Sequence, residues 1–256
     1  FPNKRAETIV EGRGARLVPG FINIRMETAQ ATEILTDPAQ DTARKNGFTT
    51  QISGGDGIAL APLLYGSLEP FRKWGGAEPT NINWHTLTEF KKTISCLPLE
   101  TNFGTFAGYN TVRRDVMVSH TGDPTDKELS VILSALKDAI EEGAQGIAIN
   151  LNTAHGRKIS HEEVRRVARL TAQTGRPLAL RLRAQTEHFM EAAQEALTVY
   201  QATGTRMLII DFLPSTLIKA QEKDFMLAYE LLASAGDGLY MEIRLEENRL
   251  VPLYEL

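Results

Sequence analysis

Short apolar segments alternate with capped amphipathic helices about seven times along the 256 residues. In three of these helices a Ser or Thr stands three residues before a Glu, which is the capping-box pattern of a helix start. These pairs are Thr86 with Glu89, Thr125 with Glu128, and Ser160 with Glu163. Apolar strands joined by such helices are typical of parallel βαβ units, arranged as a closed barrel or as an open doubly wound sheet.

The predicted strands share a short run of Val, Ile, Leu, Phe or Ala bounded by glycines or polar residues. They span 17–24, 48–53, 103–108, 146–151, 178–183, 207–211 and 239–245. No Gly-rich nucleotide-binding loop follows any of them, since the GGDG loop at 54–57 lacks the lysine of a phosphate-binding loop. The sequence therefore favours an α/β, TIM-barrel-like domain over 17–256, with 1–16 as the remnant of a preceding strand and turn. The first strand, with Leu17, Val18, Phe21, Ile22 and Ile24, is predicted to be buried.

Composition excludes several classes of partner. The net charge is −4 and the chain has no block of Lys and Arg, which argues against nucleic acid. No apolar run is long enough for a membrane span. One cysteine, Cys96, allows no intrachain disulfide, so a reducing, cytoplasmic compartment is expected. We expect Cys96 to be a buried, inert thiol.

Several short motifs together resemble one enzyme family. They occur in this order: PGFIN at 19–23, GFTT at 47–50, GGDG at 54–57, NW at 83–84, GAQG at 143–146, EE at 162–163 and RLR at 181–183. The ordered set resembles the N-acyl-D-amino-acid deacylases, or D-aminoacylases, of the amidohydrolase superfamily. The resemblance implies a metal-dependent-hydrolase barrel, a zinc cofactor and hydrolysis of linear amides. Members of that family are longer, so the barrel here is expected to be incomplete at its C-terminal end.

The resemblance fails at the positions where the family holds its metal. The first-strand histidines fall at Arg25 and Glu27, the bridging cysteine at Asp56, and the later histidines at Arg181 and Asp211. Zinc needs three or four nitrogen, sulfur or oxygen ligands that converge on one point. We therefore expect no metal cofactor.

Three interpretations of these five charged positions stay open. They can form a salt-bridge cluster that joins the strand ends, because Arg and carboxylates pair through two hydrogen bonds. They can instead be unrelated residues at a solvated barrel mouth. Alternatively, Glu27, Asp56 and Asp211 can hold Mg²⁺ or Ca²⁺, which prefer oxygen ligands.

The function predicted from these features is a metal-free, non-catalytic relative of D-aminoacylase that acts as a binding or structural subunit. Arg25, Arg181, Arg183 and Tyr109, the last at the position of a family histidine, are the predicted binding residues for a small carboxylate. The alternative is a divergent hydrolase of the C–N bond in N-acyl amino acids, with His155 and Asp211 as weak catalytic candidates. Because a barrel without its last strands leaves sheet edges open, we expect a homo-oligomer or a larger protein to complete it.

Overall fold

A computed structural model describes residues 11–26, 28–65, 82–118, 122–185, 188–214 and 219–243. Eight parallel strands are described: β1 Phe21–Met26, β2 Phe48–Ser53, β3 Asn102–Thr105, β4 Ala107–Gly108, β5 Ile147–Asn150, β6 Leu178–Arg181, β7 Met207–Ile210 and β8 Leu239–Met241. The helices are α1 Thr28–Glu33, α2 Asp41–Lys45, α4 Leu87–Ser95, α5 Tyr109–Val116, α6 Asp126–Glu141, the 3-10 helix η1 Gly156–Lys158, α7 His161–Thr174, α8 Phe189–Thr203 and α9 Lys219–Ala233. The predicted parallel α/β class is confirmed.

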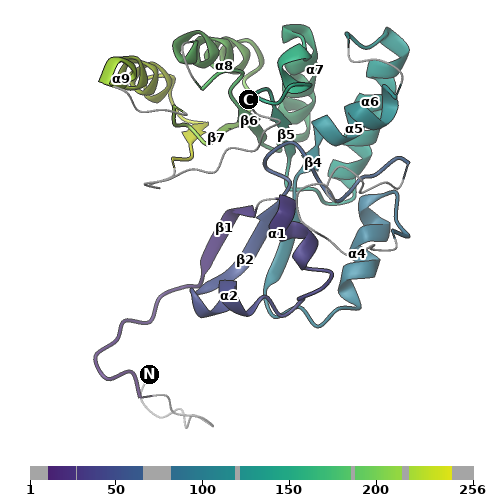
Figure 1. Cartoon of the computed structure of the whole chain (residues 1–256), viewed down its shortest axis with the longest axis vertical. Coiled ribbons are helices and arrows are strands. Elements are labelled where there is room, and N and C mark those ends of the chain that lie inside the picture. The colour runs from purple at the N-terminus through teal and green to yellow at the C-terminus, as the bar shows by residue number, and fades with distance from the viewer. Residues whose placement is uncertain are drawn as a thin grey trace.

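The strands form two sheets, in the order β1-β2-β3 and β4-β5-β6-β7-β8. Only Phe106 separates β3 from β4, so the predicted strand 103–108 is one segment with a break. Hydrogen bonds run on either side of this break: Phe106 N donates to Ser53 O at 2.9 Å, and Ala107 N donates to Gly146 O at 2.9 Å. The two sheets are thus joined into one curved layer, and α5 to α9 lie in an arc around its β4–β8 part (Figure 1).

Alternate strand residues pack into two cores. Leu178 and Leu180 of β6 belong to the large core between the sheet and the helices, whereas Ala179 packs in a small inner core with Ala148, Phe106 and Ile210. Successive side chains of a strand point to opposite faces, so the inner core lies on the concave side of the layer. This is the two-sided burial expected of barrel strands.

The helix boundaries follow the local sequence signals. All three capping boxes are present with both of their hydrogen bonds. Gly175 and Gly204 end α7 and α8 in the left-handed conformation, which glycine adopts without a steric cost. Trp84 and Phe90 lie in the core with ring centroids 5.2 Å apart.

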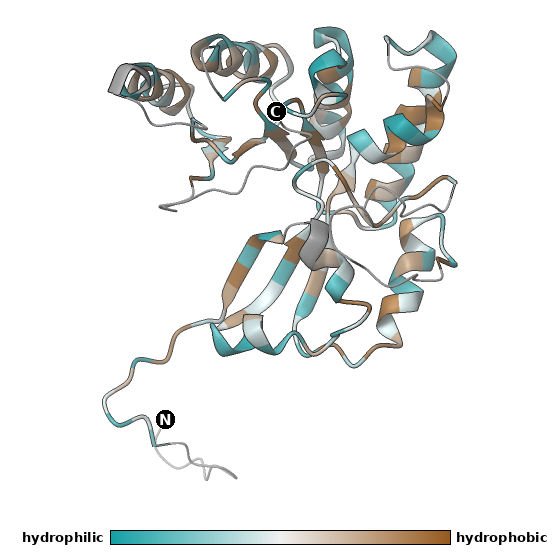
Figure 2. Cartoon of the chain, viewed as in Figure 1, coloured by the Kyte–Doolittle hydropathy of each residue, from teal (hydrophilic) through white to brown (hydrophobic). Residues whose placement is uncertain are grey.

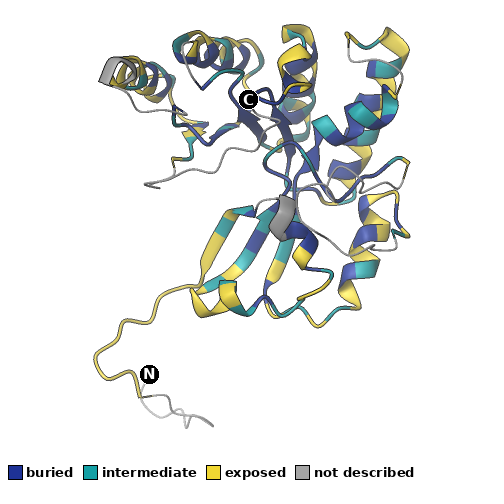
Figure 3. Cartoon of the chain, in the orientation of Figure 1, coloured by how far each residue is buried: buried dark blue, intermediate teal, exposed yellow. Residues whose placement is uncertain are grey.

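Three local predictions are wrong. The first strand runs from Phe21 to Met26, and its apolar residues are exposed because, within the described residues, β1 is an edge strand paired with β2 alone (Figures 2 and 3). Asp37 followed by Pro38 is the pattern of an N-cap and a first helical residue, so the sequence predicts a helix start there. Helix α2 begins only at Asp41, after Gln40 in a left-handed conformation. Cys96 is exposed rather than buried, because it caps the end of the short helix α4.

The predicted boundary between residues 1–16 and the domain at 17–256 rests on the sequence alone. Residues 1–10 lie outside the described residues, and 11–20 contain a turn but no strand or helix. The division of the chain at 16 and 17 therefore stays a prediction. None of the helices in the described ranges is long and apolar enough to cross a membrane.

Two neighbouring residues of α6 test the core assignment. Ile132 is fully buried, whereas Val131 is 52% exposed on the other face of the helix. Ile132→Ala should lower the free energy of unfolding by about 2–5 kcal/mol, because it removes buried methyl groups and leaves a cavity. Val131→Ala should change it by less than about 0.5 kcal/mol. Urea titration of both variants by circular dichroism measures this, and equal losses would contradict the assigned helix face.

Candidate functional site

Charged and amide side chains gather where the strands end. Arg25 lies near the end of β1, Asn150 and Arg181 end β5 and β6, and Asp211 and Glu242 directly follow β7 and β8. The carboxyl ends of parallel strands meet at one face of a barrel, which is where barrel enzymes place their sites. This set of residues is the candidate functional site.

An ion-pair cluster forms its centre, and we call Arg25, Arg181, Asp211 and Glu242 the strand-end cluster. Arg181 Nη2 lies 2.7 Å from Asp211 Oδ2, with both side chains at most 4% exposed. Arg25 Nη1 lies 3.4 Å from Asp211 Oδ1 and 3.4 Å from Glu242 Oε2. Each oxygen of Asp211 thus faces a different arginine. Two cations and two anions make the cluster neutral as a whole.

Backbone geometry holds Asp211 in place. Its φ angle of 57° is left-handed, a conformation that costs energy in a residue other than glycine and needs support from its surroundings. The support comes from Glu242 Oε2, which accepts from Asp211 N at 2.6 Å, and from Gln185 Nε2, which donates to Asp211 O at 2.5 Å. Gln185 Oε1 in turn accepts from Asn152 Nδ2 at 3.0 Å. Loops after β5 and β6 therefore fix the aspartate that follows β7.

The structure brings together three of the five positions at which the family resemblance places metal ligands. Arg25 and Arg181 both contact Asp211 as described. Asp56 lies half-buried in the loop after β2, with its Oδ1 3.4 Å from Ile58 N. Glu27 lies outside the described residues. Glu242 joins the cluster although sequence reasoning missed it. A charged residue directly after the apolar run of the last strand could have identified it. The prediction that this strand continues to 245 instead placed Glu242 inside the strand.

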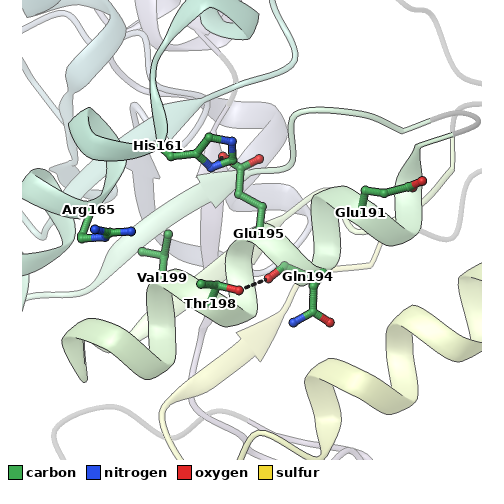
Figure 4. Close-up of a pocket in the computed structure, with 7 residues that line it drawn as sticks. All are labelled: His161, Arg165, Glu191, Gln194, Glu195, Thr198 and Val199. Carbon is green, nitrogen blue, oxygen red and sulfur yellow. Dashed lines mark hydrogen bonds and ion pairs between the residues drawn. The ribbon is translucent and has the colours of Figure 1, made fainter.

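Arg183 lies apart from this cluster. Its guanidinium makes a two-pronged contact with Glu195, with Nε to Oε2 at 2.9 Å and Nη2 to Oε1 at 2.7 Å. His161 Nδ1 lies 3.0 Å from the same Oε1. Glu195 and His161 also line a cavity of about 250 Å³ between α7 and α8, and Figure 4 shows the two side chains close to each other. The other lining residues are Arg165, Glu191, Gln194, Thr198 and Val199.

Tyr109 is fully buried and faces the interior. Its hydroxyl donates to Glu163 Oε2, which also accepts from Arg113 Nε at 2.7 Å. Burial raises the pKa of the Tyr109 hydroxyl, and the negative charge of Glu163 raises it further. The phenol therefore stays protonated and donates to Glu163. Its predicted role in ligand binding is not tested by this contact.

His155 stands in the loop after β5, directly before η1, and is exposed. Its imidazole has no hydrogen-bond partner within the part of the chain that the structure describes. His85 and His188 lie on helix-start segments elsewhere in the fold, and His120 falls outside the described residues. The four histidines that the structure describes therefore do not converge on the strand-end cluster.

The residues of the strand-end cluster do not fit a zinc ion. Zinc ligands must offer lone pairs, whereas Arg25 and Arg181 bring positive charge to the positions where the resemblance expects imidazoles. Both oxygens of Asp211 are already engaged by these guanidiniums. In the described ranges, no three His, Cys, Asp or Glu residues are grouped so that they could hold a metal ion.

Comparison with known proteins places this geometry in context. No protein-family model matches the sequence. An N-acyl-D-aspartate deacylase of Alcaligenes xylosoxydans xylosoxydans is 26% identical over 210 residues, which are 81% of this chain and 41% of that protein. A D-aminoacylase of the same organism is 24% identical over 198 residues, 76% of this chain and 40% of the relative. This chain is related to the N-acyl-D-amino-acid deacylases.

Solved structures of deacylases share the fold. A crystal structure of D-aminoacylase, described as defining a novel subset of amidohydrolases, superposes with a TM-score of 0.76 at 21% identity. N-acyl-D-glutamate deacylase from Bordetella bronchiseptica, complexed with zinc and a phosphonate inhibitor, gives 0.72 at 19% identity. Each match covers 88% of this chain and 47% of the deacylase. The chain thus spans less than half the length of these deacylases, and the expected incomplete barrel is confirmed.

Loss of Arg181 tests the cluster. In Arg181→Ala, Asp211 keeps only one of its two arginines in a buried setting, so the free energy of unfolding should fall by about 3–5 kcal/mol. Arg169→Ala, on an exposed face of α7, is the matched control and should stay within about 0.5 kcal/mol of the parent. Guanidinium titration measures both. An Arg181→Ala variant as stable as the control would show that the cluster does not hold the strand ends.

The buried phenol predicts a dependence of stability on alkaline pH. The pKa of Tyr109 is raised in the folded state above its ordinary value of 10.0, so above that pH the unfolded chain loses a proton that the folded chain keeps. Stability from this group is complete below pH 10 and falls above it, by at most about 1.4 kcal/mol per pH unit. Tyr109→Phe should have a shallower alkaline slope in urea titrations between pH 9 and 11. Tyr229→Phe, at an exposed position of α9, should keep the parent slope, and an unchanged slope in Tyr109→Phe would contradict the prediction.

Proposed function

We propose that this chain is a metal-free, non-catalytic relative of the N-acyl-D-amino-acid deacylases that acts as a structural or binding subunit. The observation that carries the proposal is the pairing of Arg25 and Arg181 with Asp211 at positions where the family resemblance expects metal ligands. A metal ion connects several strand ends at one point, and the ion pairs of Arg25 and Arg181 with Asp211 likewise connect the ends of β1, β6 and β7.

The chemistry of the cluster supports a non-catalytic role. A general base must reach the proton that it abstracts, within hydrogen-bond distance or through one water. Asp211 is 1% exposed, and both of its oxygens face arginines. The carboxylate is therefore engaged within the protein, and the weak catalytic candidate His155 lies exposed in a loop without a partner from this cluster.

The ligand class implied by the arginines is a small carboxylate. Arg25 and Arg181 contact Asp211, and Arg183 makes its two-pronged contact with Glu195. A carboxylate ligand would therefore have to replace a protein carboxylate, which supports the structural role over ligand binding. The cytoplasmic location expected from the single cysteine stays a prediction.

Metal analysis and an activity assay test the proposal together. Protein purified without chelator should contain no stoichiometric transition metal by mass spectrometry, and EDTA should leave its melting temperature unchanged. It should release no amino acid from N-acetyl-D-aspartate or N-acetyl-D-methionine, with and without added zinc. The Alcaligenes N-acyl-D-aspartate deacylase and D-aminoacylase, purified and assayed in parallel, are the positive controls for the two substrates. Stoichiometric zinc with turnover would overturn the proposal and establish the hydrolase alternative.

A further inference from the structure

Asn46 is the only asparagine among the 256 residues that directly precedes a glycine. Asparagine is a thermolabile residue, because the main-chain nitrogen of the following residue can attack its side-chain carbonyl carbon, Cγ. A following glycine favours this attack, since it has no Cβ to obstruct the approach and its main chain is conformationally permissive. The sequence therefore identifies the pair Asn46–Gly47 as a candidate site of deamidation.

The structure places this pair at the exposed end of α2. The helix is five residues long, has no buried residue and lies at the amino end of β2 (Figure 1). Ring closure needs rotation about the ψ angle of Asn46, which is 7° in the folded state. It also needs release of Gly47 N from Arg44 O, to which it donates at 2.9 Å. The last turn of α2 must therefore open first, and short exposed segments with few buried contacts open at a low free-energy cost.

We propose that Asn46 deamidates in the folded protein through a succinimide formed with Gly47, and that this modification loosens the start of the β1–β2 pairing. Gly47 N loses its proton and bonds to Asn46 Cγ, the bond from Cγ to Nδ2 breaks, and Nδ2 leaves as ammonia. Water then opens the five-membered ring at one of its two carbonyls, which gives either an aspartyl or an isoaspartyl residue at position 46. The net reaction consumes one water and releases one ammonia, with no change of oxidation state.

Both products disturb contacts at the junction of α2 and β2. Asn46 Nδ2 donates to Thr42 O at 2.8 Å, and a carboxylate oxygen in its place cannot donate to that carbonyl. The new negative charge also lies at the carboxyl end of a helix, where the helix dipole is unfavourable for anions. An isoaspartyl residue further lengthens the main chain before Gly47, whose O accepts from Phe21 N at 2.9 Å. The modification therefore reaches the first residue pair of the two strands, Phe21 and Phe48.

Asn102 provides a matched comparison within the same chain. It is also exposed, and its Nδ2 donates to Thr49 O at 3.1 Å, much as Asn46 Nδ2 donates to Thr42 O. Its next residue, however, is Phe103 of β3, whose side chain obstructs attack by the main-chain nitrogen. A difference in conversion between the two asparagines thus reports the effect of the following glycine. The deamidation does not depend on whether the chain binds metal or turns over a substrate.

Peptide mapping of the full folded chain by mass spectrometry, after incubation at mildly alkaline pH, tests the proposal. Conversion of Asn46 to a carboxyl form should exceed that of Asn102 at least about tenfold, because only Asn46 precedes a glycine. Aspartyl and isoaspartyl peptides should both appear and separate by chromatography. Asn46→Gln should abolish the conversion, since a longer side chain forms the ring much more slowly. A chain that keeps Asn46 intact when folded but converts it in urea, or an aspartyl product alone, would overturn the proposal.

A second measurement tests the effect on the strands. Hydrogen exchange at the Phe21 amide should be faster in the deamidated chain than in the unmodified chain, because its acceptor, Gly47 O, is displaced. Amides of α6, which does not contact α2, should exchange equally in both. A Phe21 amide that exchanges at the same rate in the two forms would overturn the proposed loosening of the β1–β2 pairing.

Discussion

The buried contact between Arg181 and Asp211 is the interaction on which the arrangement of the strand carboxyl ends depends. It joins the end of β6 to the residue after β7, and Arg25 and Glu242 extend it to β1 and β8. β1 and β8 are the two outer strands of the layer, and side chains link them at the carboxyl end. Desolvation offsets much of the attraction in a buried ion pair, so such a pair adds little net stability while its disruption is costly. The cluster therefore acts more as a constraint on geometry than as a source of stability.

A second buried contact, between Tyr109, Arg113 and Glu163, also fixes the geometry of neighbouring elements. The phenol and the guanidinium share one carboxylate oxygen, and Glu163 also closes the capping box of α7 through Ser160. One carboxylate thus fixes the start of α7 and ties it to α5. In both places charged or phenolic side chains, which could act in catalysis, form ion pairs and hydrogen bonds with each other in the protein interior. This is why the cluster geometry supports a structural role over a catalytic one, even though the fold is shared with hydrolases.

Local signals in the sequence predicted the order and type of the elements well. Capping boxes at Thr86, Thr125 and Ser160 are decided by residues three apart, and all three formed as expected. Features decided by distant neighbours were harder to predict. The apolar pattern of β1 is the same whether the strand is central or at an edge, so burial did not follow from it. The convergence of Arg25, Arg181 and Asp211 could be expected because strand ends meet at one face, whereas Glu242 required the exact end of β8.

The exposure of β1 and the strand-end cluster have a common physical origin. A strand in the middle of a parallel sheet is fixed by backbone bonds on both sides, and its side chains need not hold it. Among the residues that the structure describes, β1 has such bonds only to β2, with register shifts along the pair. Its carboxyl end is instead fixed by Arg25, whose guanidinium reaches acidic residues beyond two other strands. Its amino end has no comparable charged residue, since Arg25 is the first charged residue of the strand. The amino-terminal half of β1 is therefore held by its pairing with β2 and by the contact between the rings of Phe21 and Phe48.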